Sequence, residues 1–212
     1  LKKGGNKPIS FAAVPSIASH VFPTAIQKLR ARYPDLTLSL NTLKIEEAID
    51  YLLLNKGEMV ALSYKLDHPG LSMQQLYSGD LVALVPVAHP LAHLETVSVS
   101  DLSKETVIGI DPADPYGSIL AAPFRDNGLP IRYDIQARTG QMIEALVAQG
   151  LGVAIIDKFS IAGPARQPGA VFRPLYEKTR FRSFAAFNAQ HPRSHFAEEL
   201  VRYLKSEMRQ VS

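Results

Sequence analysis

The apolar and polar positions of residues 9–62 follow a β-α-β-α-β order. Residues 9–14 form a β-prone apolar run, and the apolar side chains of residues 22–33 then recur at the spacing of one helix face. Leu36, Leu38 and Leu40 alternate with polar residues, which predicts a half-buried strand. A helix over residues 45–53 and a short buried strand over 59–62 complete the order.

The same order returns further along the chain. Residues 107–110 predict a strand, residues 118–127 a helix, and the alternating residues 131–137 another strand. A well-buried helix containing Met142 and Leu146 follows, with Gly150 as the glycine just past its end. A buried strand over 153–156 then ends at Asp157. Because the order is repeated, two similar lobes are a better prediction than one continuous sheet.

The segments outside the two repeats predict further strands. Residues 71–76 and 81–85 form two strand-like runs, and His89-Pro90 marks a turn. In the last part of the chain, residues 171–175 and 184–187 are strand-like, and a helix follows a Ser194 cap. The predicted fold class is therefore α/β with two lobes.

Composition narrows the class of protein. The chain has 212 residues, of which 46% are hydrophobic and 20% charged, values typical of a soluble globular protein and not of a disordered one. No apolar run approaches the length of a transmembrane helix. The absence of cysteine excludes disulfides, a thiolate nucleophile and cysteine metal sites, and is compatible with the cytoplasm.

The charge argues against nucleic-acid binding by this chain. Its net charge is only +3, and apart from Lys2, Lys3 and Lys7 the basic residues are scattered. The chain begins Leu-Lys-Lys, without methionine or the apolar core of a signal peptide. We therefore expect a fragment of a longer protein.

Polar residues follow the predicted parallel strands where each strand ends. Ligands of open α/β sheets bind at such carboxyl ends, where helix N-termini also offer free N–H groups. If the lobes face one another, six segments line one cleft for a small polar ligand: Pro15-Ser16, Asn41-Thr42, Ser63-Tyr64, residues 111–116 with Asp111, Asp114 and Tyr116, Arg138-Thr139, and Asp157.

Each of these residues also has a purely structural interpretation. Ser16, Thr42 and Thr139 suit helix caps, and the two roles are compatible. Asp111 and Asp114 lie beside prolines and suit turns. Arg138 suits a surface position, and Asp157 suits the cap of the turn after its strand.

Signals for catalysis, cofactors and metals are weak. Gly150-Leu151-Gly152 follows a helix and precedes a strand, the reverse of a dinucleotide-binding loop. His89 and His93 have a zinc-like spacing, but Pro90 interrupts the helix that this geometry needs. We therefore predict no enzyme activity, no cofactor and no metal.

Five segments together carry a resemblance to a known family. The chain resembles the effector-binding (regulatory) domain of LysR-type transcriptional regulators over nearly its whole length. The segments occur in the order and spacing of that family, namely residues 13–19, 29–38, 67–71, 84–92 and 144–156.

The resemblance implies a fold, an assembly and a location. The fold is that of type 2 periplasmic binding proteins, with two Rossmann-like lobes joined by two crossover strands. Lobe I would comprise residues 1–85 plus 187–212, and lobe II residues 86–186. Family members form homodimers and then tetramers, act in the cytoplasm without a membrane, and bind promoter DNA through an N-terminal winged helix-turn-helix that this chain lacks.

The resemblance also implies effector contacts. They fall on Pro15, Ser16 and Ile17 after the first strand and on Arg138 and Thr139 before the long helix of lobe II. Many members have Ser or Thr near the position of Ile45, where this chain departs, and Thr42 is the substitute. The segment 111–118 resembles the branch that senses lysine-related amino acids and opines, and an acidic residue at position 157 departs from many relatives.

Three functions follow from these observations. The preferred one is an effector-sensing domain that binds a small polar metabolite, such as an amino acid or an opine-like compound, between its lobes. The first alternative is a free-standing solute-binding protein of a transport system. The second is a small α/β enzyme that uses Asp111 or Asp157 as a base, for which the sequence offers only the carboxylates themselves.

Overall fold

The computed structural model describes residues 8–164 and 166–211. Lys2, Lys3 and Lys7 lie outside the described residues. The chain folds into two compact units. Unit 1 contains the described residues up to Tyr77 together with Arg182–Val211, and unit 2 contains Ser78–Phe181. The lobe boundaries expected from the sequence, after residues 85 and 186, remain a prediction.

Unit 1 is built on a five-stranded sheet of order β2-β1-β3-β10-β4. Its strands are β1 (Ile9–Ala13), β2 (Leu38–Thr42), β3 (Met59–Leu62), β4 (Leu71–Gly79) and β10 (Phe181–Asn188). Strand β1 pairs in parallel with both β2 and β3, with Phe11 opposite Leu40 and Met59. Strand β10 runs antiparallel to β3. The carboxyl ends of β1, β2 and β3 therefore lie at one edge of this sheet.

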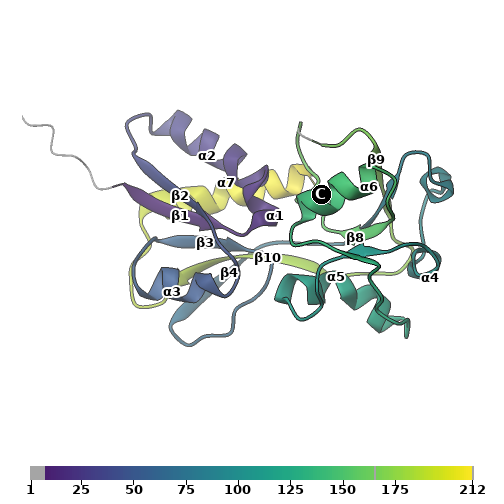
Figure 1. Cartoon of the computed structure of the whole chain (residues 1–212). Coiled ribbons are helices and arrows are strands. Elements are labelled where there is room, and N and C mark those ends of the chain that lie inside the picture. The colour runs from purple at the N-terminus through teal and green to yellow at the C-terminus, as the bar shows by residue number, and fades with distance from the viewer. Residues whose placement is uncertain (1–7, 165, 212) are drawn as a thin grey trace, which may run out of the picture. The chain divides into compact units, whose positions relative to one another are not determined.

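Helices cover both faces of the unit 1 sheet (Figure 1). The helices are α1 (Pro15–Ala18), α2 (Val21–Arg32), α3 (Glu47–Leu53) and α7 (His195–Val211). The chain leaves β1 for β2 on one side and returns past β1 to β3, so right-handed crossovers place α2 and α3 on opposite faces. Helix α7 packs against α2 and buries Leu200 and Leu204 completely.

Unit 2 repeats this strand order with shorter strands. A three-stranded sheet has the order β8-β5-β9, and β6 pairs in parallel with β7. The strands are β5 (Val82–Pro86), β6 (Ile108–Gly109), β7 (Ile135–Gln136), β8 (Ala154–Ile156) and β9 (Ala170–Pro174). A parallel bridge between Val107 and Val153 links the two sheets. The resulting order, β7-β6-β8-β5-β9, matches that of unit 1 strand for strand.

Two helices of unit 2, α5 (Pro115–Asp126) and α6 (Gly140–Ala148), follow the parallel strands β6 and β7. A 3₁₀ turn, η1 (Pro90–His93), and the short helix α4 (Val99–Leu102) lie between β5 and β6. Figure 1 shows α5 and α6 on opposite faces of the β6–β8 region. Gly150 follows α6 with a φ of +78°, a conformation that favours glycine.

The α/β class and the repeated β-α-β-α-β order predicted from the sequence are confirmed. Two element boundaries differ. Helix α5 begins at Pro115 instead of Ser118, because Asp114 caps it by accepting hydrogen bonds from the N–H groups of Tyr116 and Gly117. The strand predicted over 131–137 is only Ile135–Gln136, because its partner β6 is equally short.

Two predictions of burial were wrong. Met142 is 55% exposed, because α6 is apolar on several sides and packs with the face that carries Ile143 and Val147. Leu40 is 46% exposed, because β2 is an edge strand whose last three residues are uncovered. No helix among the described residues is long and apolar enough to span a membrane.

Gly117 makes the close approach of α5 to the loop before it possible. A Cβ at this position would overlap the backbone carbonyl oxygen of Asp111, which cannot rotate away as a side chain can. We expect Gly117→Ala to lower the free energy of unfolding by about 1–3 kcal/mol, measured by urea denaturation. Ser118→Ala, at the next and partly exposed position, is the control and should change it by less than about 0.5 kcal/mol. Equal losses in the two variants would contradict the interpretation.

Candidate functional site

The loop after β1 places a hydroxyl group where it has no protein partner. Pro15 occupies the first position of the four-residue helix α1, which turns the chain directly after the strand. Ser16 follows and is only 3% exposed, and its Oγ makes no hydrogen bond to any described residue. Ile17 is completely buried and anchors the turn. A buried hydroxyl without a partner is uncommon, and this one lies at the strand end where a ligand was expected.

The other candidate residues of unit 1 lie at the ends of β2 and β3. Thr42 is the last residue of β2 and is exposed. Ser63 follows β3 and is 1% exposed. Parallel pairing brings the ends of β1, β2 and β3 to one edge, so Ser16, Thr42 and Ser63 belong to adjacent loops. Ile45, at the position where many relatives have a hydroxyl, is buried and apolar.

In unit 2, the loop after β6 carries two exposed carboxylates. Asp111 Oδ1 accepts a hydrogen bond from the N–H of Ala113 at 2.9 Å. Asp114 Oδ1 accepts from the N–H groups of Tyr116 and Gly117 at 2.8 and 3.2 Å. Both aspartates therefore form turns or caps, as their structural interpretation predicted. Each uses one oxygen in these bonds and retains a second oxygen for other contacts.

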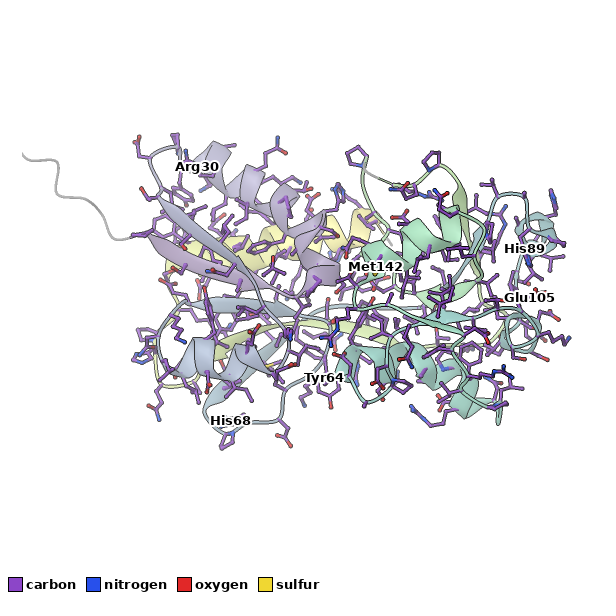
Figure 2. The ribbon with its side chains drawn as sticks, in the orientation of Figure 1. Arg30, Tyr64, His68, His89, Glu105 and Met142 are labelled. Carbon is purple, nitrogen blue, oxygen red and sulfur yellow. The ribbon has the colours of Figure 1, made fainter. Side chains whose placement is uncertain are left out.

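The loop after β7 carries two candidate residues, Arg138 and the helix-capping Thr139. Thr139 Oγ1 accepts a hydrogen bond from the N–H of Met142 at 3.2 Å and so caps α6. Arg138, immediately before it, is exposed. Figure 2 shows Met142 in the first turn of α6. The threonine therefore has its predicted structural role, which leaves its hydroxyl hydrogen free to donate to another acceptor.

Asp157, after β8, is completely buried and is surrounded by donors. Its Oδ1 accepts from the N–H of Ser160 at 3.0 Å, and its Oδ2 accepts from Ser160 Oγ at 2.8 Å. The hydroxyl of Tyr116 also donates to Oδ2 and lies 3.1 Å from Ser160 Oγ. Among the described residues no basic side chain forms an ion pair with this carboxylate.

Burial alters proton binding in this cluster. It raises the pKa of the Asp157 carboxyl above its ordinary value, although the hydrogen bonds from Tyr116 and Ser160 oppose the change. Burial and the neighbouring Asp157 charge together raise the pKa of the Tyr116 hydroxyl well above its ordinary value. The protonated, neutral form of each group is therefore favoured, and a charge on one disfavours a charge on the other.

Sequence reasoning missed two residues of this cluster. Ser160 lies three residues after Asp157, a spacing typical of an aspartate that caps a turn, and this was the available signal. Gly140, the first residue of α6, lies directly against Ser160, since a Cβ there would be 2.5 Å from its Oγ. No sequence pattern indicated that contact.

The described residues contain no group of three or more histidine, aspartate or glutamate side chains placed to hold a metal ion. His89 Nδ1 accepts from the N–H of Leu91, and its Nε2 lies 3.4 Å from Glu105 (Figure 2). His89 therefore holds a turn in place. The strand ends provide hydroxyls, carboxylates and one guanidinium, groups that bind polar ligands.

Comparison with known proteins gives a consistent picture. A family model described as the LysR substrate binding domain matches residues 2–209. The transcriptional activator protein LysR of Escherichia coli (strain K12) is 25% identical over 184 residues, which cover 79% of this chain and 58% of the relative. The regulator DgcR of a Pseudoalteromonas species is 25% identical over 163 residues, or 77% and 56% of the two chains. The chain thus spans little more than half the length of these relatives.

Solved structures share the fold. The OxyR C206 mutant of Corynebacterium glutamicum superposes with a TM-score of 0.84 at 17% identity, covering 99% of this chain and 67% of that one. The BenM effector binding domain, solved with its effector benzoate, gives a TM-score of 0.80 at 20% identity and coverages of 95% and 91%. At these identities the superpositions establish the fold, which is the predicted type 2 periplasmic-binding-protein-like one.

The raised pKa of Asp157 predicts how stability changes with pH. A folded-state pKa above the unfolded value means that the folded protein binds the proton more tightly, so this contribution is full at low pH and is lost as pH rises. Asp157→Asn removes the titration. We expect the native chain to gain unfolding free energy relative to Asp157→Asn as the pH falls from about 8 to about 4.5. Chemical denaturation at both pH values measures this difference.

The control for this measurement is Asp126→Asn, which replaces a carboxylate whose side chain is 71% exposed. Its difference from the native chain should change much less over the same interval, because water stabilises an exposed charge in both states. If the stability of native chain and Asp157→Asn differed by the same amount at both pH values, the assigned effect of burial would be wrong.

Ser16 and Thr139 should respond oppositely to loss of their hydroxyls. Ser16→Ala removes a buried oxygen without a partner among the described residues, so unfolding free energy should stay constant or rise by up to about 1 kcal/mol. Thr139→Ala removes the cap of α6 and should cost about 1 kcal/mol. Urea denaturation of the two variants without added ligand tests this; a loss in Ser16→Ala as large as that in Thr139→Ala would contradict it.

Proposed function

The chain belongs to the LysR substrate-binding domain family, and we propose that it senses a small polar metabolite on behalf of a full-length LysR-type regulator. The family consists of the effector-binding domains of transcription regulators and not of enzymes, which confirms the predicted absence of catalytic activity. The curated relatives are regulators, so the observations favour this function over a free-standing solute-binding protein.

The observation that carries the proposal is the hydroxyl of Ser16. A buried donor without a partner costs folding free energy, and an effector that accepts its hydrogen bond would remove that cost. Thr139, which follows β7 in unit 2, also retains a free donor. We propose that one effector contacts both residues, together with Pro15, Ile17, Thr42, Ser63 and Arg138, as the family resemblance implies.

The charges of unit 2 suggest the chemical class of the effector. Asp111 and Asp114 each have an oxygen that suits a cationic group, whereas Arg138 suits a carboxylate. A compound that carries charges of both signs, such as an amino acid or an opine-like derivative with a basic end, complements these groups. The partly buried Tyr116 bonds to the buried Asp157, and we propose that the two support the effector site from behind.

The proposed response follows from linkage. An effector alters the equilibrium between conformations only by binding one of them more tightly than the other. In the full-length regulator, which acts in the cytoplasm as a homodimer or tetramer, the altered conformation changes how the N-terminal domains bind promoter DNA. The present chain supplies the sensing step.

A thermal-shift screen tests the proposal directly. The 212-residue chain is heated with individual amino acids, opines and aromatic acids, and a compound that binds only the folded state raises the melting temperature. At a concentration about 100 times its dissociation constant, such a compound adds about 2.7 kcal/mol of stability. We expect compounds with both a carboxylate and a basic group to give the largest shifts.

Two variants tie the shift to the proposed residues. Ser16→Ala and Thr139→Val should each reduce the shift caused by a compound that stabilises the native chain, because each loses a hydrogen bond worth about 1 kcal/mol. Arg132→Ala replaces an 85% exposed arginine elsewhere in unit 2 and should leave the shift unchanged. Undiminished shifts in both variants would overturn the assignment of the site.

A further inference from the structure

Three loops of unit 2 meet at one buried carboxylate. The loop after β6 reaches Asp157 through the Tyr116 hydroxyl. The loop after β8 contributes Asp157 itself and Ser160, which donates to the carboxylate through both its N–H and its Oγ. The loop after β7 arrives at the same place, because Gly140 lies against the Ser160 side chain. Residues 116, 140 and 157 are far apart in the chain, so only the fold brings them together.

The cluster has more connections than a cap requires. Asp157 Oδ1 alone satisfies the Ser160 N–H and so caps the turn after β8. The second oxygen is directed to Tyr116 and to Ser160 Oγ, and these two hydroxyls also lie within hydrogen-bonding distance of each other. The additional bonds join the first turn of α5 to the loop after β8, which a cap does not need.

Stability alone does not explain a carboxylate here. The groups that face Asp157 are neutral donors, namely the hydroxyls of Tyr116 and Ser160 and the N–H groups of Phe159 and Ser160. Asp114, the other charge felt at Tyr116, is also an acid. The adjacent Lys158 points elsewhere, with its ammonium 5.8 Å from the centre of the Phe172 ring. A buried charge without a counter-ion costs free energy that a neutral or apolar side chain would save.

We propose that Asp157 is a positioning residue that fixes the three strand-end loops of unit 2 relative to one another. Through Tyr116 it holds the turn that presents Asp111 and Asp114. Through Ser160 it holds the surface on which Gly140 and the Thr139 cap of α6 rest. The importance of these loops for an effector depends on the proposed function, whereas the mechanical link among them does not.

Gly140 allows the start of α6 to contact Ser160 because it has no side chain. A Cβ at this position would lie 2.5 Å from both Cβ and Oγ of Ser160 and 3.2 Å from Ile156 Cδ1. Helix α6 could then no longer begin against Ser160 without a shift. Thr139, its cap, would move with it, although its own hydroxyl is untouched.

Amide hydrogen exchange of individual residues, followed by NMR on this chain, tests the link. Three amides report on the three loops: Gly117, Met142 and Ser160, each bonded to a side-chain oxygen of its loop. Tyr116→Phe and Ser160→Ala each remove hydroxyl bonds to Asp157 and leave the backbone cap intact. We expect both to accelerate exchange at Gly117 and Met142 by about fivefold or more, as loss of one net hydrogen bond predicts.

The matched control is Tyr133→Phe. Tyr133 lies in the same unit, burial raises its pKa to about 12, and its hydroxyl has no hydrogen-bond partner within the described parts of the chain. This variant should leave exchange at Gly117, Met142 and Ser160 unchanged. Gly140→Ala should accelerate exchange at Met142 and Ser160 while leaving the ladder between β5 and β9 protected.

Two results would overturn the proposal. In one, Tyr116→Phe accelerates amide exchange only at Gly117, which would mean that the loops open independently of one another. In the other, exchange rises equally at these amides and in the β5–β9 ladder, which would make the cluster an ordinary contributor to global stability. Neither result depends on finding an effector, so a thermal-shift screen without hits would count against the proposed function and not against the link.

Discussion

The parallel pairing of one short strand with neighbours on both sides is the constraint on which both units depend. In unit 1, β1 lies between β2 and β3, and in unit 2, β6 lies between β7 and the bridge to β8. Parallel strands end on the same side of a sheet, so every loop that follows them is delivered to one edge. The candidate residues come from distant parts of the sequence, and this pairing gathers them within each unit.

The two units treat buried polar groups at this edge differently. Ser16 in unit 1 is buried without a partner, which leaves its hydrogen-bonding capacity for a molecule from outside. Asp157 in unit 2 is buried with its oxygens occupied by the protein's own donors. The first arrangement suits recognition and the second suits rigidity. A sensing domain needs both, because a ligand contact is specific only if the groups around it are held in place.

Much of this could be read from the sequence. Period-two and helical patterns located nearly every element. The local pattern of the strand ends and the family resemblance both selected Ser16 and Thr139 as candidates, which remains a prediction. The predictions that failed concerned properties that depend on contacts with other elements. The length of β7 is set by β6, and the exposure of Met142 depends on which face of an apolar helix packs. The link from Tyr116 to Asp157 spans 41 residues, and no local spacing encodes it.

The strand order has a consequence for biosynthesis. Unit 2 is one continuous stretch, Ser78–Phe181, so all its strands exist once that stretch has left the ribosome. Unit 1 lacks its inner strand β10 and the helix α7 that covers α2 until the last part of the chain has been made. The N-terminal half of unit 1 must therefore wait with an open sheet edge and an uncovered apolar face while unit 2 is translated and folds. Of these two units, the one whose synthesis begins earlier is the one completed later.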